Sequence, residues 1–257
     1  MVNGKALAVG LFSLLLCGCA LNGNAPRHTS DSRYSSEQVL RTSGNHQELI
    51  KLYKTQLKEK ESADVRLKLV STYLDSKDYE SALFYVEPLL KQNPPLAQAY
   101  FLAGKAHYSL GQIDDAVSLL TRAAQLDEKN GEIENLLGVA MSIRGDFDKA
   151  REWFTLARQN MYSDMVVKNN LAMLDLIEGQ CIRAANRLLP LVNQENASKK
   201  VWHNLALAYA QCDMKTEFTQ LLSEEKYTQK EIDAIYLQLA HAEFKQLEGP
   251  QPLEVVQ

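Results

Sequence analysis

The four cysteines of this chain are the residues whose chemistry would say most about where the protein works. Cys17 and Cys19 stand one residue apart at the end of an apolar run, while Cys181 and Cys212 lie far downstream. A thiol can bind a metal, form a disulfide or carry a covalent group. A metal site at the first pair is disfavoured, because no second Cys/His pair follows at a spacing that zinc sites use.

The residues before this pair indicate an export signal. One early cation, Lys5, precedes Ala6–Leu16, which is almost entirely apolar. The run is too short to cross a bilayer as a helix, which takes ~20 residues. A positive start, a short apolar middle and small residues behind it are typical of a cleaved signal peptide. The simplest alternative is a plain signal that happens to end in two cysteines.

The stretch Leu16-Cys17-Gly18-Cys19 resembles the box of bacterial lipoproteins, in which a large apolar residue and two small residues precede a cysteine. The resemblance implies that Cys19 is lipidated and that cleavage follows Gly18. Ala20, rather than Asp, comes next in the mature chain. In that family this implies sorting to the outer membrane, with the protein anchored by lipid at the periplasmic face.

Composition narrows the range of partners. The formal net charge is −4 and no run of basic residues occurs, so neither nucleic acid nor an anionic membrane surface is an expected ligand. Residues 20–36 are polar, contain Gly, Pro and Ser, and lack a helical period. They are expected to form a flexible tether.

Downstream of the tether, the chain repeats itself every 34 residues. The repeat is marked by an alanine, followed four residues later by a large apolar side chain. Glycines recur at the same step, and a fifth window from Lys199 gives Trp202-x-x-Leu205-Ala206-x-x-Tyr209. The aligned alanines are Ala82, Ala116, Ala150 and Ala184.

This pattern resembles the tetratricopeptide repeat, which has a 34-residue period of two helices. Apolar residues recur at steps of three and four in each window, as amphipathic helices require. Small residues such as Ala150 and Gly138 are expected where two helices pack closely, and Gly145-Asp146 is expected to turn the chain between them. Stacked helix pairs would share one continuous core, so the predicted fold is an all-α tetratricopeptide-repeat superhelix with helical caps.

The predicted organisation divides the chain into ten segments. They are a lipoprotein signal peptide at 1–18, the lipidated cysteine and tether at 19–36, an N-terminal helical cap at 37–62, repeats at 63–96, 97–130, 131–164 and 165–198, a degenerate fifth repeat at 199–222, a C-terminal capping helix at 223–248 and a flexible tail at 249–257.

The repeat register also places the second pair of cysteines. Cys181 begins the second helix of its repeat, and Cys212 ends the first helix of the next. The turns within successive repeats stack side by side, so the two thiols could meet within the ~7 Å between Cα atoms that a disulfide allows. The alternative is two independent, partly buried thiols.

No enzyme is expected. The sequence has no Gly-rich phosphate loop, no GxSxG and no HExxH. The histidines are scattered, and His107 takes the place of the repeat's tyrosine, which favours a packing role. No cofactor, metal or small-molecule substrate is predicted.

In this repeat family, the first helix of each pair lines a concave binding surface. Carrying its positions over gives an apolar and aromatic end and a row of asparagines in the middle. Asparagine amides offer both a donor and an acceptor, which suits a peptide backbone. Only Lys105 is placed for the family's carboxylate clamp, so an apolar groove for a short, partly hydrophobic peptide is favoured. The predicted groove residues are Leu67, Leu74, Phe101, Lys105, Tyr108, Asn135, Val139, Asn169, Asn170, Met173, His203 and Asn204. The alternative is that these side chains merely pack between repeats and cap helices.

Two further stretches narrow the resemblance. The first is NNLA…G…A…LLPL followed by VWHNLALAYA, and the second is the preceding EIENLLGVAMSIRGDFDKAREWF. Both are similar to the TadD family of repeat lipoproteins of tight-adherence (Flp) pilus systems. This implies a pilotin-like adaptor whose partner is the outer-membrane secretin or another pilus-assembly component. The alternatives are a repeat lipoprotein of another envelope assembly, such as a type IV pilus pilotin or the β-barrel assembly machine, and an accessory regulator of a cell-wall enzyme.

Overall fold

The computed structural model describes residues 29–194, 197–223 and 227–241. In these ranges the chain forms thirteen helices and no strand. The helices are α1 (Thr29–Thr42), α2 (His46–Glu59), α3 (Ala63–Asp75), α4 (Tyr79–Leu90), α5 (Ala97–Ser109), α6 (Ile113–Leu126), α7 (Gly131–Arg144), α8 (Phe147–Gln159), α9 (Asp164–Ile177), α10 (Cys181–Val192), α11 (Lys199–Gln211), α12 (Lys215–Ser223) and α13 (Gln229–Ala240).

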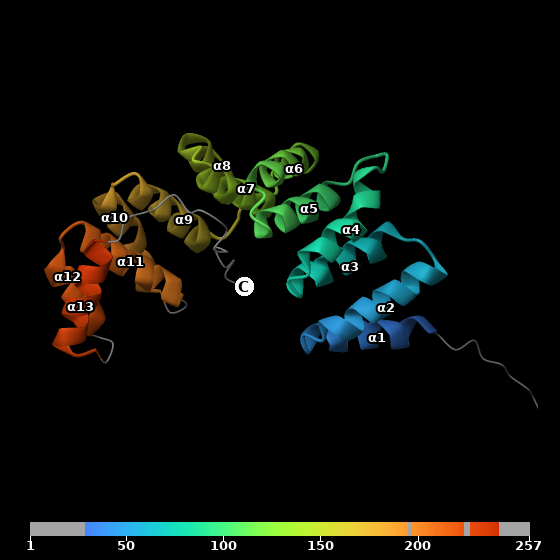
Figure 1. The fold of residues 1–257 in the computed structure, drawn as a ribbon, viewed down its shortest axis with the longest axis horizontal. Coiled ribbons are helices and arrows are strands. Elements are labelled where there is room, and N and C mark those ends of the chain that lie inside the picture. Colours follow the sequence, from blue (N-terminus) through green and yellow to red (C-terminus); the bar gives the residue numbers. More distant parts are fainter. Residues whose placement is uncertain (1–28, 195–196, 224–226, 242–257) are drawn as a thin grey trace, which may run out of the picture.

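The helices stack in sequence as antiparallel pairs and form an arch (Figure 1). Each helix packs against the next one along the chain, and the first helices of neighbouring pairs also touch, as in α7 with α9 and α9 with α11. Contacts between neighbours of this kind give a superhelix whose core runs along the array. The core continues from α2 to α13 in two clusters that meet within α9.

The helix boundaries follow from capping residues and tight turns. Five capping side chains each accept a hydrogen bond from the first turn of the helix that follows them. They belong to Asn45, Ser62, Asp78, Ser163 and Ser198. The turns within the pairs place one residue in the left-handed region every 34 residues. Their φ values are 62° at Lys77, 76° at Gly111, 89° at Gly145, 72° at Gly179 and 55° at Asp213.

Glycine and alanine allow the two helices of a pair to approach closely. The four aligned alanines are completely buried. A Cβ on Gly138 would lie 2.7 Å from the ring of Phe154, and one on Gly104 would lie 2.7 Å from Leu120. The expected role of small residues at these positions is therefore present in the structure. In the last pair the alanine is replaced by Phe218, which is also fully buried.

The predicted tether is corrected at its end, because residues 29–36 belong to α1. The second half of α1 is held against α2 by a polar cluster. The Tyr53 hydroxyl donates to Glu37 (2.9 Å) and accepts from Arg41 (2.8 Å). Burial raises the pKa of Glu37, but the hydrogen bonds from Tyr53 and Arg41 and the nearby charge of Lys68 outweigh it and lower that pKa overall. These contacts join residues that are 12 to 16 positions apart in sequence, so the composition of a short segment does not indicate them.

The predicted repeats begin at, or one residue after, the starts of helices. The first helices of the repeats start at Ala63, Ala97, Gly131 and Lys199, as the windows do, and at Asp164, one residue early. The predicted capping helix corresponds to α13, whose start has the expected capping box between Thr228 and Glu231. The signal peptide, Cys19, the tether before residue 29 and the tail at 249–257 lie outside the described residues.

Candidate functional site

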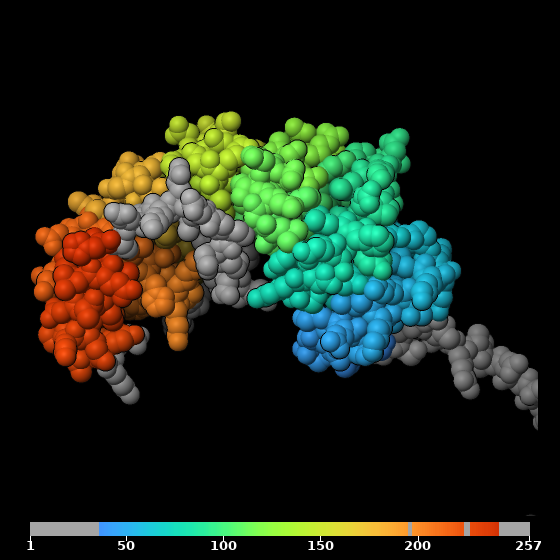
Figure 2. All heavy atoms as spheres, in the orientation of Figure 1, coloured from blue at the N-terminus to red at the C-terminus, as the bar shows by residue number. Residues whose placement is uncertain are grey.

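The inner side of the arch is the surface that the stacked first helices provide. In Figure 1, α5, α7, α9 and α11 lie on the inner side of α6, α8, α10 and α12. Figure 2 shows the two ends of the array, α1–α2 and α12–α13, on opposite sides of a hollow. A curved array of this kind presents an extended concave surface.

Four of the twelve predicted groove residues reach solvent. Leu67 on α3, Lys105 on α5 and Met173 on α9 are half-buried, and His203 on α11 is exposed. The other eight are buried in the core or between repeats. They are Leu74, Phe101, Tyr108, Asn135, Val139, Asn169, Asn170 and Asn204. The side chains that a partner would meet are therefore fewer and more widely spaced than the sequence pattern indicated.

The row of asparagines hydrogen-bonds within itself. Asn170 donates from its amide to the side-chain oxygen of Asn135 (3.0 Å), and Asn204 donates in the same way to Asn169 (2.7 Å). Both pairs join the first helices of neighbouring repeats and lie at least nine-tenths buried. A buried amide must be satisfied, and here the next repeat supplies the partner. Binding of these amides to a peptide backbone stays a prediction.

A pocket of about 350 Å³ lies at the C-terminal end of the array. It extends the surface to which His203 belongs. The residues lining it are mostly aromatic or aliphatic, with Lys199 and His203 as the charged or titratable members. They are Ala197, Lys199, Trp202, His203, Ala206, Leu221, Leu222 and Tyr227. The sequence pattern marked Trp202 and Ala206 only as repeat positions and gave no signal for the residues contributed by α12.

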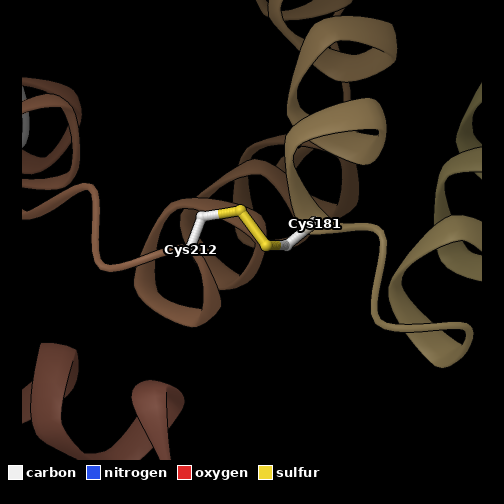
Figure 3. The surroundings of a disulfide bond; sticks show 2 residues. All are labelled: Cys181 and Cys212. Atoms are coloured by element: carbon white, nitrogen blue, oxygen red, sulfur yellow. A yellow bond between two sulfur atoms is a disulfide. The ribbon is translucent and has the colours of Figure 1, made fainter.

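Cys181 and Cys212 form a disulfide, shown in Figure 3. Their Cα atoms are 5.6 Å apart, within the range that the stacked turns were expected to allow. Cys181 is the first residue of α10, and Cys212 follows the last residue of α11. The bridge therefore joins the fourth repeat to the fifth, next to the end of the array that carries the pocket.

Sequence reasoning missed an ion cluster around Asp175. This carboxylate on α9 is completely buried. It accepts from Arg151 of α8 (2.9 Å) and from Arg183 (2.8 Å) and Arg187 (2.5 Å) of α10. Glu178 completes the cluster by bonding to Arg151 and Arg183. The feature of the sequence that could have indicated this cluster is a single acidic residue between Leu174 and Leu176, in an otherwise apolar stretch of helix. Its partners come from both flanking helices, so the cluster ties the third repeat to the fourth.

The described residues hold neither a cluster of side chains for a metal ion nor a helix that could span a membrane. Among them, no group of three or more His, Cys, Asp or Glu side chains could hold a metal ion. In the same ranges, none of the helices combines the length and the apolar character needed to cross a bilayer. His107 is half-buried and its Nδ1 lies 2.5 Å from the side-chain oxygen of Gln112, in agreement with a packing role.

Comparison with known sequences gives one family match. Residues 75–155 match the family described as anaphase-promoting complex, cyclosome, subunit 3. The match covers under a third of the chain, across the first to third repeats. No curated protein matches the sequence.

Solved structures resemble the chain over more of its length. The APC/C hetero-tetramer Cut9–Hcn1 is 18% identical with a TM-score of 0.60, and the match covers 79% of this chain and 44% of that one. A thermophilic TPR protein of Thermus thermophilus is 18% identical with a TM-score of 0.57, covering 69% and 97%. The pilF protein of Pseudomonas aeruginosa is 16% identical with a TM-score of 0.57, covering 69% and 82%. At these identities the likeness concerns the fold.

Proposed function

The chain is an all-α tetratricopeptide-repeat protein, a fold suited to protein–protein interaction, and we propose that it acts as a lipid-anchored adaptor for a pilus assembly machine. In this proposal Cys19 carries the lipid, and the repeat array works at the periplasmic face of the outer membrane. The inner face of the array holds a segment of the outer-membrane secretin of an Flp pilus system, as a pilotin does.

The observation that carries the proposal is the set of solvent-reaching side chains on the first helices. Leu67 and Met173 offer apolar contacts, while Lys105 and His203 offer polar ones. The spread of these contacts from α3 to α11 suits an extended peptide better than a compact ligand. The buried asparagine pairs keep the repeats in register behind that face.

The mechanism follows from tethering. A lipid supplies membrane affinity, and binding of a secretin segment then holds the secretin near the bilayer at a raised local concentration. Assembly at the membrane becomes easier without any chemical step by the array. The similarity of pilF supports the proposal at the level of the fold.

Site-specific crosslinking in cells tests the proposal. A photoreactive amino acid at Met173 or Leu67 on the inner face is compared with one at Leu156, which is exposed on α8. The expected result is capture of a secretin, identified by mass spectrometry, from the two inner positions and not from Leu156. Capture of β-barrel assembly or cell-wall proteins from the inner positions, or equal capture from all three, would contradict the pilus role.

The anchor has a separate test. Cys19→Ala is expected to move the protein from the outer-membrane fraction to the soluble periplasmic fraction. A variant that stays with the outer membrane would show that the lipid is not what holds the protein there.

A further inference from the structure

The outer face of α10 differs from that of the other second helices. Ile182, Asn186 and Leu189 lie on one side of α10, at steps of four and three residues. Ile182 is 65% exposed and Leu189 is 45% exposed. The residues that the 34-residue repeat makes equivalent to these two are polar in α4, α6, α8 and α12. They are Glu80, Asp114, Asp148 and Thr216 for Ile182, and Glu87, Thr121, Thr155 and Ser223 for Leu189. The repeat fold therefore does not require apolar residues here, and two of them together in contact with solvent indicate a surface that another segment covers.

The charge of α10 also differs from that of the other second helices. The first turns of α4, α6, α8 and α12 each contain an acidic residue, whereas α10 contains none along its whole length. Arg183 and Arg187 of α10 are partly exposed. With Arg151 they bond to two carboxylates, those of Asp175 and Glu178, so this ion cluster has one positive charge in excess. An apolar segment that carries negative charge would complement the outer face of α10.

We propose that residues 242–257, which follow α13 in the sequence, bind back onto the outer face of α10. Three glutamates and one lysine give this segment a formal charge of −2. It contains the dipeptide Leu-Glu twice, as Leu247-Glu248 and Leu253-Glu254. The segment thus offers two apolar side chains, each with a carboxylate beside it, to a face with two exposed apolar residues and two arginines.

The spacing of these groups agrees on the two sides. Ile182 and Leu189 are seven residues apart on a helix, a rise of about 10 Å. The two leucines of the segment are six residues apart and can be separated by up to about 20 Å. One leucine can therefore cover each apolar residue of α10, with the glutamates facing Arg183 and Arg187. Burial of the leucines supplies most of the binding, because ion pairs between exposed side chains contribute little.

The end of α13 brings the segment within reach of α10. Tyr236 of α13 donates a hydrogen bond to Asp213, in the turn that follows α11. The neighbouring Cys212 is bridged to Cys181, the first residue of α10 (Figure 3). α13 contacts α11, and α11 contacts α10. Packed helices lie about 8–10 Å apart, so these two steps amount to about 20 Å. Sixteen extended residues span up to about 50 Å, and attachment to the same chain keeps the segment at a high local concentration.

A photoreactive amino acid at Asn186 tests this contact. Asn186 lies between Ile182 and Leu189 on the outer face, so the replacement leaves both apolar residues in place. The matched control is Ser118, which is exposed at the same repeat position on α6. The whole chain is purified in detergent as a mixture of unlabelled chains and chains labelled with heavy nitrogen, irradiated and digested. We expect mass spectrometry to find Asn186 crosslinked to residues 242–257 of the same chain, and Ser118 not crosslinked to them.

Paired variants of the segment identify the residues that bind. Leu247→Ser/Leu253→Ser should lower the yield of the crosslink by about fivefold or more, because it removes the buried apolar surface. Val255→Ser/Val256→Ser removes two apolar side chains outside the Leu-Glu pairs and should leave the yield unchanged.

Three results would overturn the proposal. The first is capture of the segment from Asn186 that is no greater than capture from Ser118. The second is a crosslink that joins labelled to unlabelled chains, which would make a second copy of the chain the occupant. The third is an equal effect of the leucine and valine variants, which would show contact without recognition of the Leu-Glu pairs.

The inference does not depend on the adaptor function, because it concerns the outer face of the array and is tested with the purified chain alone. If Asn186 captures the segment but Met173 captures no secretin in cells, the adaptor function fails and the contact with α10 stands. If Met173 captures a secretin but Asn186 does not capture the segment, the reverse holds.

Discussion

Removing the disulfide should loosen one end of the array by a calculable amount. Cys181 and Cys212 are 31 residues apart in sequence. Closing a loop of that length lowers the entropy of the unfolded chain by an amount worth about 3.7 kcal/mol at 25 °C. Replacing both cysteines with serine removes little buried apolar surface, because both side chains are only half-buried. The loss in free energy of unfolding should therefore be about 3–4 kcal/mol, or roughly 10 °C in Tm.

The loss should also be local. Repeat arrays are stabilised by contacts between neighbours, so the effect should be concentrated near the bridge. Urea unfolding followed by circular dichroism measures the size of the loss, and amide hydrogen exchange locates it. Exchange should speed up in α10–α13 and stay unchanged in α3–α6.

A reductant provides the matched control for the serine variant. Adding it to the wild-type chain should reproduce the loss, and adding it to Cys181→Ser/Cys212→Ser should change nothing. An unfolding midpoint that is the same in the oxidised wild type and the double variant would refute the reasoning. Faster exchange spread evenly over the array would refute the claim that the effect is local.

Four further changes test other parts of the structure. Lys77→Gly should raise the free energy of unfolding by about 0.5–1 kcal/mol, because Lys77 occupies the left-handed region that glycine adopts without strain; Gly145→Lys should lower it, and urea midpoints compare the two. Gly138→Ala should lower the free energy of unfolding by about 1–2 kcal/mol, although alanine has the better helix propensity, because the new methyl group would overlap Phe154. Adding Phe154→Leu to this variant should recover part of the loss, and a non-additive double-mutant cycle would show it. Asp175→Asn should lower the free energy of unfolding, measured with urea, by about 2–3 kcal/mol. This is less than the loss on breaking a wholly buried ion pair, because the three arginines around Asp175 are 27–45% exposed. Asp148→Asn, which changes an exposed side chain on α8, should not measurably change the free energy of unfolding. The pKa of Glu37 is lowered in the folded protein, so its contribution to the free energy of unfolding is present above the ordinary pKa of 4.5 and disappears as pH falls through the folded pKa. The difference in thermal midpoint between the wild type and Glu37→Gln should therefore close on acidification. A difference that stays constant with pH would exclude this role.

The repeat itself was predictable from sequence because its determinants are local and periodic. The buried alanines, the close contacts of Gly104 and Gly138 and the glycines of the turns all recur at a fixed step, so four copies reinforce one another. The same register placed Cys181 and Cys212 at stacked turns, where the structure joins them. The end of the predicted tether was wrong, because α1 depends on contacts with Tyr53 that no local pattern contains.

The surface was harder to predict than the fold. Position within the repeat indicates which residues belong to the first helix, but exposure depends on the helices packed beside it. Phe101 and the asparagines stand at positions of the repeat that were predicted to line the groove, but the neighbouring repeat buries them. In the same way, the partners of Asp175 come from two other helices, and their convergence depends on how repeats three and four stack.

The sequence by itself determined the period, the helix pairs and their turns, because apolar spacing and glycine act over a few residues. Only the tertiary structure decided which side chains remain in contact with solvent and where the array leaves room for a ligand. The pocket beside Trp202 shows the difference. Its lining joins Trp202 and Ala206, which are repeat positions on α11, to Leu221 and Leu222 of α12, and only the packing of the two helices brings these residues together.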